Sequence, residues 1–336
     1  MSADVKGIVP TGAIRFNSDS NKMECWIGDK WMEISVSESA SIGARGISAG
    51  GAAPGASPYA RVNTIQYITI ATLGDAVDFG DLTRNTSGSY TSASTTRGII
   101  AGGSSPTSDT VDSITIASAG NSIDYCNLTA SKQNGAGFSN QVRAIQAGGS
   151  TPSQINTIDY LTISISNDAI DFGDLIDHTV DYLNGGANQT RGYVAGGNTP
   201  TKINNIQYVT IMTTGNSVDF GDLTVARRMA ETINTNTRGV IIGGETPGDT
   251  NVIDYITIPT TGNAQDFGDV QSFRREMNAA MASPIRGVYG GGYASPSGIN
   301  SMEYINPVSK GNGADFGDLT STIYANRGLS NAHGGL

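Results

Sequence analysis

Short runs in which apolar and polar residues alternate recur along most of the chain. Examples are IQYITI at 65–70, IDYLTI at 158–163 and IQYVTI at 206–211. Alternation with a period of two predicts β-strands, and here both strand faces carry apolar groups. Strands of that kind are covered on both sides, as when sheets pack face to face. Glycine and proline interrupt the chain between the runs, so the pattern predicts an all-β protein without long helices.

Two motifs recur in a fixed relation to these runs. Arg-Gly-x-x-x-Gly-Gly has five copies and a sixth with one change, which begin at Arg45, Arg97, Arg143, Arg191, Arg238 and Arg286. Asp-Phe-Gly-Asp follows the alternating run and begins at Asp78, Asp171, Asp219, Asp266 and Asp315, with Asp-Tyr-Cys-Asn at Asp124 in the second unit. Copies of the first motif lie 46 to 52 residues apart. A period near 48 residues is typical of propellers and solenoids.

Each period contains four short predicted strands: a stretch of small residues, the strand that ends in Gly-Gly, the alternating run, and the Asp-Phe-Gly-Asp segment. Four strands in each of six units predict a six-bladed β-propeller whose repeats start near 45, 97, 143, 191, 238 and 286. The small residues suit a crowded innermost strand, and the motif aromatic is expected to fill the wedge between blades. The first unit lacks an inner strand, which 326–335 is expected to supply, closing the ring.

At these residues the sequence resembles the kelch family of propellers. That family ends its second strand with a double glycine and carries a large aromatic residue in its fourth. The double glycines here are Gly50-Gly51, Gly102-Gly103, Gly148-Gly149, Gly196-Gly197, Gly243-Gly244 and Gly291-Gly292. Phe79, Tyr125, Phe172, Phe220, Phe267 and Phe316 stand where the family has tryptophan. The resemblance implies a kelch-like propeller over roughly 41–336.

The segment before the repeats has a different pattern. AIRF, KMECWI and KWMEI, within 10–34, predict three short strands joined by tight turns, and both tryptophans of the chain lie here. We therefore divide the chain into an N-terminal β-meander, 1–36, and the propeller, 37–336. A meander of this size is too small to be stable alone. It must pack on the propeller, on a copy of itself or on another protein, and the candidate anchoring residues are Ile14, Phe16, Trp26 and Trp31.

Composition and charge then exclude several classes of protein. The net charge is −10 and no basic run occurs, which argues against binding nucleic acid. No stretch of 18 apolar residues is present to insert into a membrane, and the N-terminus lacks the features of a signal peptide. Two cysteines form no disulfide framework, so we expect synthesis in a reducing cytoplasm.

Candidate chemistry is sparse. The paired aspartates of each Asp-Phe-Gly-Asp motif could be acid/base groups or calcium ligands, but their repetition favours capping of turns or pairing with the recurring arginines. Those arginines could form a ring that binds an anion, although ion pairs between strands or blades are the simpler interpretation. His178 and His333 are the only histidines, so a histidine-rich metal site is not available. We expect no catalytic residue, cofactor or metal, and hence no enzyme.

The first unit is longer than the others between its double glycine and its alternating run. It spends 16 residues from Gly51 to Tyr67 where the other units spend 10 to 12. A loop inserted on a rigid scaffold is a common place for binding, although neutral insertion would look the same. The candidate ligand-contacting residues in this loop are Tyr59 and Arg61.

A second resemblance concerns both ends of the chain. The N-terminal pattern G-A-I-R-F-N-x-D-x-N-x-x-E-x-W-x-G-x-x-W looks like a short β module of structural proteins in tailed bacteriophages. The DFGDLT arrays ending in SNAHGGL look like virion proteins of phages that infect marine bacteria. The resemblance implies a virion component, such as a tail fibre, knob or capsid decoration protein, that contacts other virion proteins or a copy of itself. The alternatives are an adhesin that binds a host surface glycan and, less favoured, a polysaccharide-cleaving enzyme.

Overall fold

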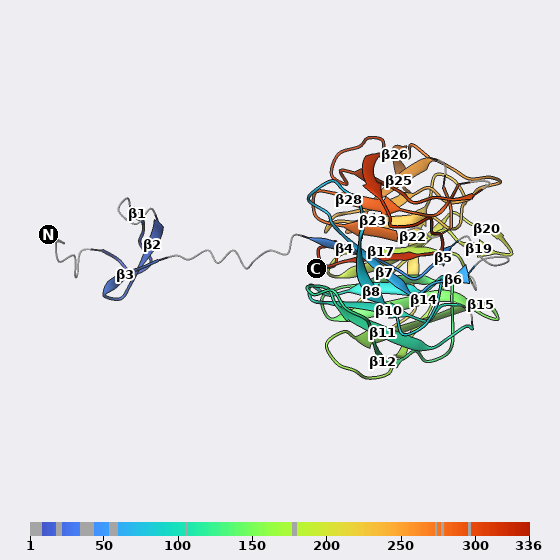
Figure 1. Ribbon diagram of the computed structural model, residues 1–336, viewed down its shortest axis with the longest axis horizontal. Helices are drawn as coiled ribbons and strands as arrows, with labels where there is room; N and C mark the ends of the chain where they lie inside the picture. Colours follow the sequence, from blue (N-terminus) through green and yellow to red (C-terminus); the bar gives the residue numbers. More distant parts are fainter. Residues whose placement is uncertain are drawn as a thin grey trace. The chain divides into compact units, whose positions relative to one another are not determined.

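The computed structural model describes residues 9–17, 22–33, 44–53, 60–104, 106–176, 180–272, 274–276, 279–294 and 297–336. The chain divides into two compact units, Met1–Ile42 and Gly43–Leu336. The expected boundary between 36 and 37 lies outside the described residues. The prediction of an all-β protein is confirmed, because the described residues form strands and turns and no helix (Figure 1). Accordingly, they contain no helix that could cross a membrane.

The smaller unit holds one antiparallel sheet of three strands in the order β1-β2-β3. Its strands are β1 (Ile14–Asn17), β2 (Lys22–Ile27) and β3 (Lys30–Glu33). The turn between β2 and β3 contains Gly28, whose φ of 69° is readily adopted only by glycine. The three strands predicted from AIRF, KMECWI and KWMEI are therefore present.

The larger unit contains six antiparallel sheets of four strands each. In sheet order, the strands are β33 (Arg327–Ser330), β4 (Arg45–Ala49), β7 (Thr64–Thr69) and β8 (Val77–Asp81); β9 (Tyr90–Ala93), β10 (Arg97–Ala101), β11 (Thr110–Thr115) and β12 (Ile123–Asn127); β13 (Ala136–Ser139), β14 (Arg143–Thr151), β15 (Ser153–Thr162) and β16 (Ile170–Asp174); β17 (Asn184–Ala187), β18 (Arg191–Ala195), β21 (Asn205–Thr210) and β22 (Val218–Asp222); β23 (Glu231–Asn234), β24 (Arg238–Ile242), β25 (Val252–Thr257) and β26 (Gln265–Asp269); and β27 (Ala279–Ala282), β28 (Gly287–Gly290), β31 (Ser301–Ile305) and β32 (Ala314–Asp318). Each sheet corresponds to one sequence repeat.

The first strands of these sheets contact one another in cyclic order. The order is β9, β13, β17, β23, β27 and β33, and β33 again contacts β9. The strands approach so closely that a Cβ atom on Gly328 would lie 2.3 Å from the backbone nitrogen of Ala280 in the neighbouring strand. This crowding explains why the segments before each Arg-Gly are rich in small residues.

The last strand of the chain completes the first sheet. β33 pairs with β4 in antiparallel register, with Leu329 opposite Ile47 and Ser330 opposite Gly46. This pairing joins residues about 280 positions apart and covers an edge of β4 that would otherwise be open. The predicted use of the C-terminal segment by the first repeat is thus confirmed at the level of strand pairing.

The fourth strand of each sheet shows why Asp-Phe-Gly-Asp is repeated. Phe79 is buried in a cluster that joins its own sheet to Ile100 and Ile114 of the next, which confirms its predicted place in the wedge. Gly80 has a φ of 147°, and a Cβ there would lie 2.5 Å from the carbonyl oxygen of Gly120 in a turn of that next sheet. The motif therefore marks a close backbone contact between sheets.

Buried charges link four of the six sheet junctions. Each pair joins a basic residue after the fourth strand of one sheet to an acid in the third strand of the next: Arg84–Asp112 at 3.3 Å, Lys132–Asp159 at 2.9 Å, Arg227–Asp254 at 3.1 Å and Arg274–Glu303 at 2.5 Å. At the other two junctions the acid is replaced by Gln66 or Gln207, and the equivalent positions hold Ile323 and Val180. At three charged junctions the basic residue occupies the same repeat position as Ile323 and Val180. At the first junction that position holds Thr86, and Arg84 reaches the acid from two residues earlier.

Candidate functional surfaces

The recurring arginines contact the neighbouring sheet. Each donates a hydrogen bond of 2.7 to 3.1 Å to a backbone carbonyl of the next sheet. Each guanidinium also stacks on a tyrosine ring of its own sheet, which is in the third strand except for Tyr125, in the fourth strand of the second sheet. For example, Arg45 donates to Ile116 and Arg286 donates to Ile70, which connects the last repeat to the first. The expected ion pairs were wrong, because the acceptors are backbone carbonyl oxygens. No pattern of side chains in the sequence identifies such acceptors.

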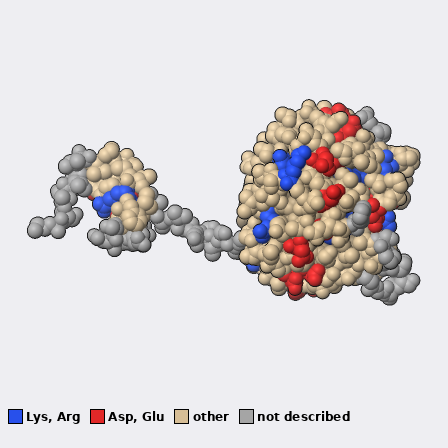
Figure 2. Space-filling model, turned by 90° about the horizontal axis from the view of Figure 1, so that it is seen from above, with Lys and Arg blue, Asp and Glu red and all other residues tan. Residues whose placement is uncertain are grey.

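The repeated aspartates are not paired with these arginines either. The turn of the next sheet caps the motif through the backbone: Asn121 Oδ1 accepts a hydrogen bond of 3.0 Å from the Asp81 amide, and Asp75 Oδ1 accepts one from the Asp318 amide. The described residues contain no group of three or more histidine, cysteine or acidic side chains arranged to hold a metal ion. Acidic and basic side chains are interspersed on the face of the larger unit that Figure 2 shows.

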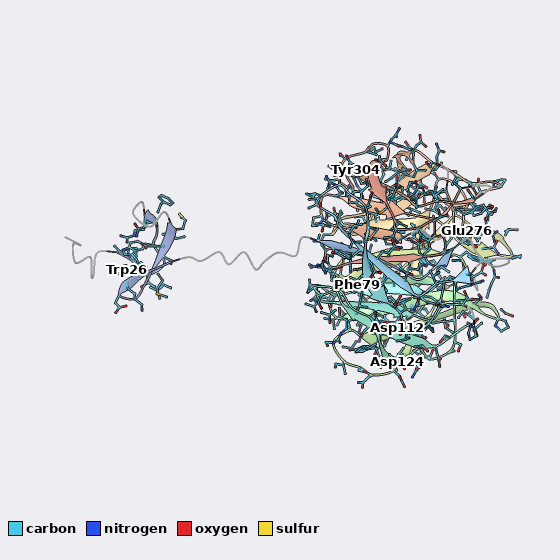
Figure 3. All side chains as sticks on the ribbon, viewed as in Figure 1. Trp26, Phe79, Asp112, Asp124, Glu276 and Tyr304 are labelled. Carbon is cyan, nitrogen blue, oxygen red and sulfur yellow. The ribbon has the colours of Figure 1, made fainter. Side chains whose placement is uncertain are left out.

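The four candidate anchoring residues lie on opposite faces of the small sheet. Trp26 is buried and contacts the ring of Trp31 edge to face, with the centroids 5.3 Å apart. The Arg15 guanidinium covers Trp31 at 4.2 Å and pairs with Glu24 at 2.7 Å. A hydrogen bond from Asn17, together with Arg15, lowers the pKa of Glu24. These side chains pack on one another on the face that carries Trp26, which Figure 3 labels, although the Trp31 Nε1 is buried without a hydrogen-bond partner.

The other face of the small sheet is apolar and exposed. Strand register places Ile14 beside Cys25 and Met32, and Phe16 beside Met23. The exposed fractions are 61% for Ile14, 58% for Phe16, 45% for Met23, 53% for Ile27 and 42% for Met32. Five large apolar side chains on one face of three short strands form the kind of patch that marks an interaction site. We call these five residues the apolar face.

In the larger unit, a ring of unusual backbone geometry precedes the innermost strands. Its members stand 46 to 49 residues apart and all have positive φ: Gly88, Asn134, Tyr182, Met229, Glu276 and Ala325. Among the described residues, every non-glycine with positive φ belongs to this set, which we call the mouth ring. Such conformations cost free energy and concentrate at functional sites.

Backbone hydrogen bonds join the members of the mouth ring. The Asn134 amide donates to the Gly88 carbonyl at 2.8 Å, the Tyr182 amide to Asn134 at 2.7 Å, and the Met229 amide to Tyr182 at 3.0 Å. Gly88 in turn donates to Ala325, and Ala325 to Glu276. The backbone is therefore held by neighbouring repeats while the six side chains differ, an arrangement suited to presenting varied chemistry on a rigid frame.

A cavity of about 300 Å³ lies over the mouth ring. Its lining includes Arg61, Gln133, Tyr182, Glu276 and Tyr324. The candidate residue Arg61 is thus placed at this cavity by the short ribbon β5 (Ala52–Ala53) and β6 (Ala60–Arg61), whereas Tyr59 lies outside the described residues. Ribbons β19 (Asn198–Thr199) with β20 (Thr201–Lys202), and β29 (Tyr293–Ala294) with β30 (Ser297–Gly298), follow other double glycines. Strands β5, β6, β19 and β20 lie at the same end of the larger unit as Glu276 (Figures 1 and 3).

The cavity breaks the repeat symmetry. The residue before each member of the mouth ring differs between repeats: it is Ser87 or Gln133 in two of them and Arg228 or Arg275 in two others. Both arginines pair with Glu245, at 2.7 and 3.6 Å. Burial raises the pKa of Glu276, and it also raises the pKa of Tyr182. The mouth ring could not be predicted from the sequence, because its residue types share nothing and only their constant offset before each inner strand recurs.

The opposite ends of the innermost strands are closed by the residues after β33. His333 lies 3.0 Å from the Ala93 carbonyl through Nε2 and accepts from the Gly335 amide at 3.1 Å through Nδ1. The Gly334 amide donates to Asn234, and Gln189 donates to the Leu336 carbonyl. Burial lowers the pKa of His333 to about 4. A second cavity, of about 390 Å³, lies at this end, and its lining includes Pro284, Val308, His333 and Leu336. His178 lies outside the described residues.

Between the two ends, the innermost strands enclose a narrow polar space. Arg327 pairs with Glu231 at 3.0 Å, and both side chains are largely buried. Burial raises the pKa of Glu231 to about 7, against the opposing effect of Arg327. The space of about 70 Å³ holds a few water molecules at most. No protein-family model matches the chain, and a search of curated proteins finds no significant match.

Proposed function

We propose that the larger unit is a six-bladed, kelch-like β-propeller. Six four-stranded sheets, one for each repeat, support this architecture. Cyclic contacts between the innermost strands and the pairing of β33 with β4 support closure of the ring. Arginine contacts from each repeat to the next, including that from Arg286 to the first repeat, add further support.

The protein acts as a non-enzymatic component of a bacteriophage virion, such as a fibre, knob or decoration protein. It is made in the host cytoplasm and assembles with other virion proteins through its smaller unit, while the propeller is displayed for attachment. The observation that carries this proposal is the apolar face, whose five exposed side chains leave a small sheet without a core. The ion pair of Arg15 with Glu24 lies on the other face, so on the apolar face docking would desolvate chiefly the charge of Lys30, which pairs with Ile27 at the edge of β3.

The test replaces apolar-face residues by aspartate in the full chain. Ile14→Asp with Phe16→Asp should abolish incorporation into particles or association between copies, because each buried carboxylate would lack a partner. The matched control is Val77→Asp with Ile123→Asp, which changes two residues of similar exposure, 52% and 62%, on fourth strands of the larger unit. Purified virions are probed for each variant by quantitative mass spectrometry. Equal incorporation of both double variants, or absence of the wild-type chain from virions, would refute the proposal.

A second candidate function is adhesion to a host surface glycan. It is favoured by the cavity over the mouth ring, which combines polar groups with tyrosine rings on a rigid backbone. Binding of fluorescently labelled protein to host cells, with and without enzymatic removal of surface polysaccharide, tests this function. Binding that is unaffected by the removal would exclude it.

A further inference from the structure

The lining of the cavity over the mouth ring includes two charged side chains, Arg61 and Glu276, to which the described part of the chain gives no side-chain hydrogen bond. Arg61 makes no side-chain hydrogen bond to a described residue, and its Nε is buried without an acceptor. Glu276 is half-buried and makes no side-chain hydrogen bond or ion pair among the described residues, although Arg275 and Arg228 attract its carboxylate from a greater distance. A buried polar atom without a partner, such as Arg61 Nε, carries a substantial desolvation cost, and in a cavity such an atom indicates a missing ligand.

The surrounding groups define what the ligand must offer. Gln133 and Asn134 contribute amides, each both donor and acceptor, and Tyr182 contributes a hydroxyl and an aromatic surface. Arg61 can only donate hydrogen bonds, whereas an ionised Glu276 can only accept them. A ligand that satisfies all of these must carry several groups able both to donate and to accept, together with a less polar face for the tyrosine ring.

The charges around the cavity narrow the class of ligand further. Arg61 and Glu276 have opposite formal charges, and the other charged groups that act on Glu276, Arg228 and Arg275 against Glu245 and Asp249, also sum to zero. An anionic ligand would be repelled by Glu276, and a cationic ligand by Arg61. The volume of about 300 Å³ accommodates one or two sugar rings. Hydroxyl groups on a pyranose are both donors and acceptors, and the ring has a less polar face.

We propose that this cavity binds a neutral hexose or N-acetylhexosamine unit. Its hydroxyls donate to the Glu276 carboxylate and accept from the Arg61 guanidinium, and its ring packs on Tyr182. The strained backbone at Tyr182 and Glu276, with φ of 53° and 78°, holds both side chains before the ligand arrives. This inference deepens the proposal of glycan adhesion and is independent of the virion proposal.

The test uses the full chain and free glucose, galactose, mannose and N-acetylglucosamine as separate probes. Saturation-transfer NMR, followed by titration, should detect millimolar binding of at least one of them. Glu276→Gln retains the size of the side chain and Arg61→Met retains its apolar stem; each should weaken that binding tenfold or more, because each removes a charge-assisted hydrogen bond. Asp124→Asn, on an exposed fourth strand, is the control and should leave binding unchanged (Figure 3).

Charged analogues complete the experiment. Glucuronate and glucosamine should bind at least tenfold more weakly than the neutral sugars. The proposal is overturned if no neutral sugar binds, if a charged analogue binds more tightly, or if Glu276→Gln and Arg61→Met bind as well as the wild type while their melting curves are unchanged. Incorporation of the same variants into virions is measured separately, so a failed sugar site is distinguished from a failed virion assignment.

Discussion

The buried pair Arg227–Asp254 offers a sharp test because the chain contains its own neutral replacement. Both side chains are inaccessible, with 0% exposure each, and Asp254 also accepts a hydrogen bond of 3.1 Å from the Thr224 amide. At the junction between the last and first sheets, Ile323 and Gln66 occupy the equivalent positions. There the Thr320 amide donates the corresponding hydrogen bond to Gln66 at 2.8 Å.

Replacing one partner of the pair should be costly, and replacing both should be tolerated. Arg227→Ile or Asp254→Gln alone leaves a buried charge without its partner, a loss of about 3–5 kcal/mol of unfolding free energy. At roughly 2 °C per kcal/mol for a large domain, each single variant should melt about 6–10 °C below the wild type. The double variant copies the Ile323–Gln66 junction and should recover to within about 2 kcal/mol of the wild type.

The assay is a thermodynamic double-mutant cycle measured by calorimetry and far-ultraviolet circular dichroism at pH 7. The matched control moves the charge in the other direction: Ile323→Arg alone should destabilise, and Ile323→Arg with Gln66→Asp should recover part of the loss. If the single variants melt with the wild type, or if the double variant loses the sum of both single losses, the junction does not work as described.

Three further predictions concern other contacts. Gly221→Ala places a Cβ 2.6 Å from the Gly262 carbonyl at a φ of 142° and should lower the free energy of unfolding by about 1–3 kcal/mol in denaturant titrations. The control Gly248→Ala, whose Cβ would meet no atom within 4 Å, should change it by less than about 0.5 kcal/mol. His333 binds its proton less tightly in the folded state, so its contribution to stability should be lost as pH falls from about 6.5 to about 4, by up to roughly 3 kcal/mol. The variant His333→Gln should flatten that part of the plot of unfolding free energy against pH. An unchanged plot would contradict a buried neutral imidazole. Deletion of 327–336 exposes the edge of β4 and should replace the single calorimetric transition by a broad one at lower temperature; a truncated chain that melts as the wild type does would show that β33 is dispensable.

The features that sequence could predict are those that each repeat needs in the same chemical form. Phe79 and Gly80 recur because wedge filling and close backbone approach have few solutions, and so the strands and their period were readable. By contrast, Arg45 and its equivalents donate to backbone carbonyls, and no side-chain pattern identifies such acceptors. Tyr182 and Glu276 were unpredictable as a site because the mouth ring repeats a backbone conformation, not a residue type.

The small sheet shows a similar limit. Sequence alternation predicted its strands and selected Ile14, Phe16, Trp26 and Trp31 together. Only the register, which pairs Trp26 with Trp31 across β2 and β3, separates the self-packed tryptophans from the exposed Ile14 and Phe16. Alternation alone does not say which face a partner covers.

A crystal structure of the protein is the measurement that tests the central claim most directly. The account predicts six four-stranded sheets around one axis, with β33 between β4 of its own sheet and the neighbouring strands β9 and β27. Density for a soaked neutral sugar is expected between Arg61 and Glu276. An open superhelix of sheets, or a last strand detached from β4, would contradict the account.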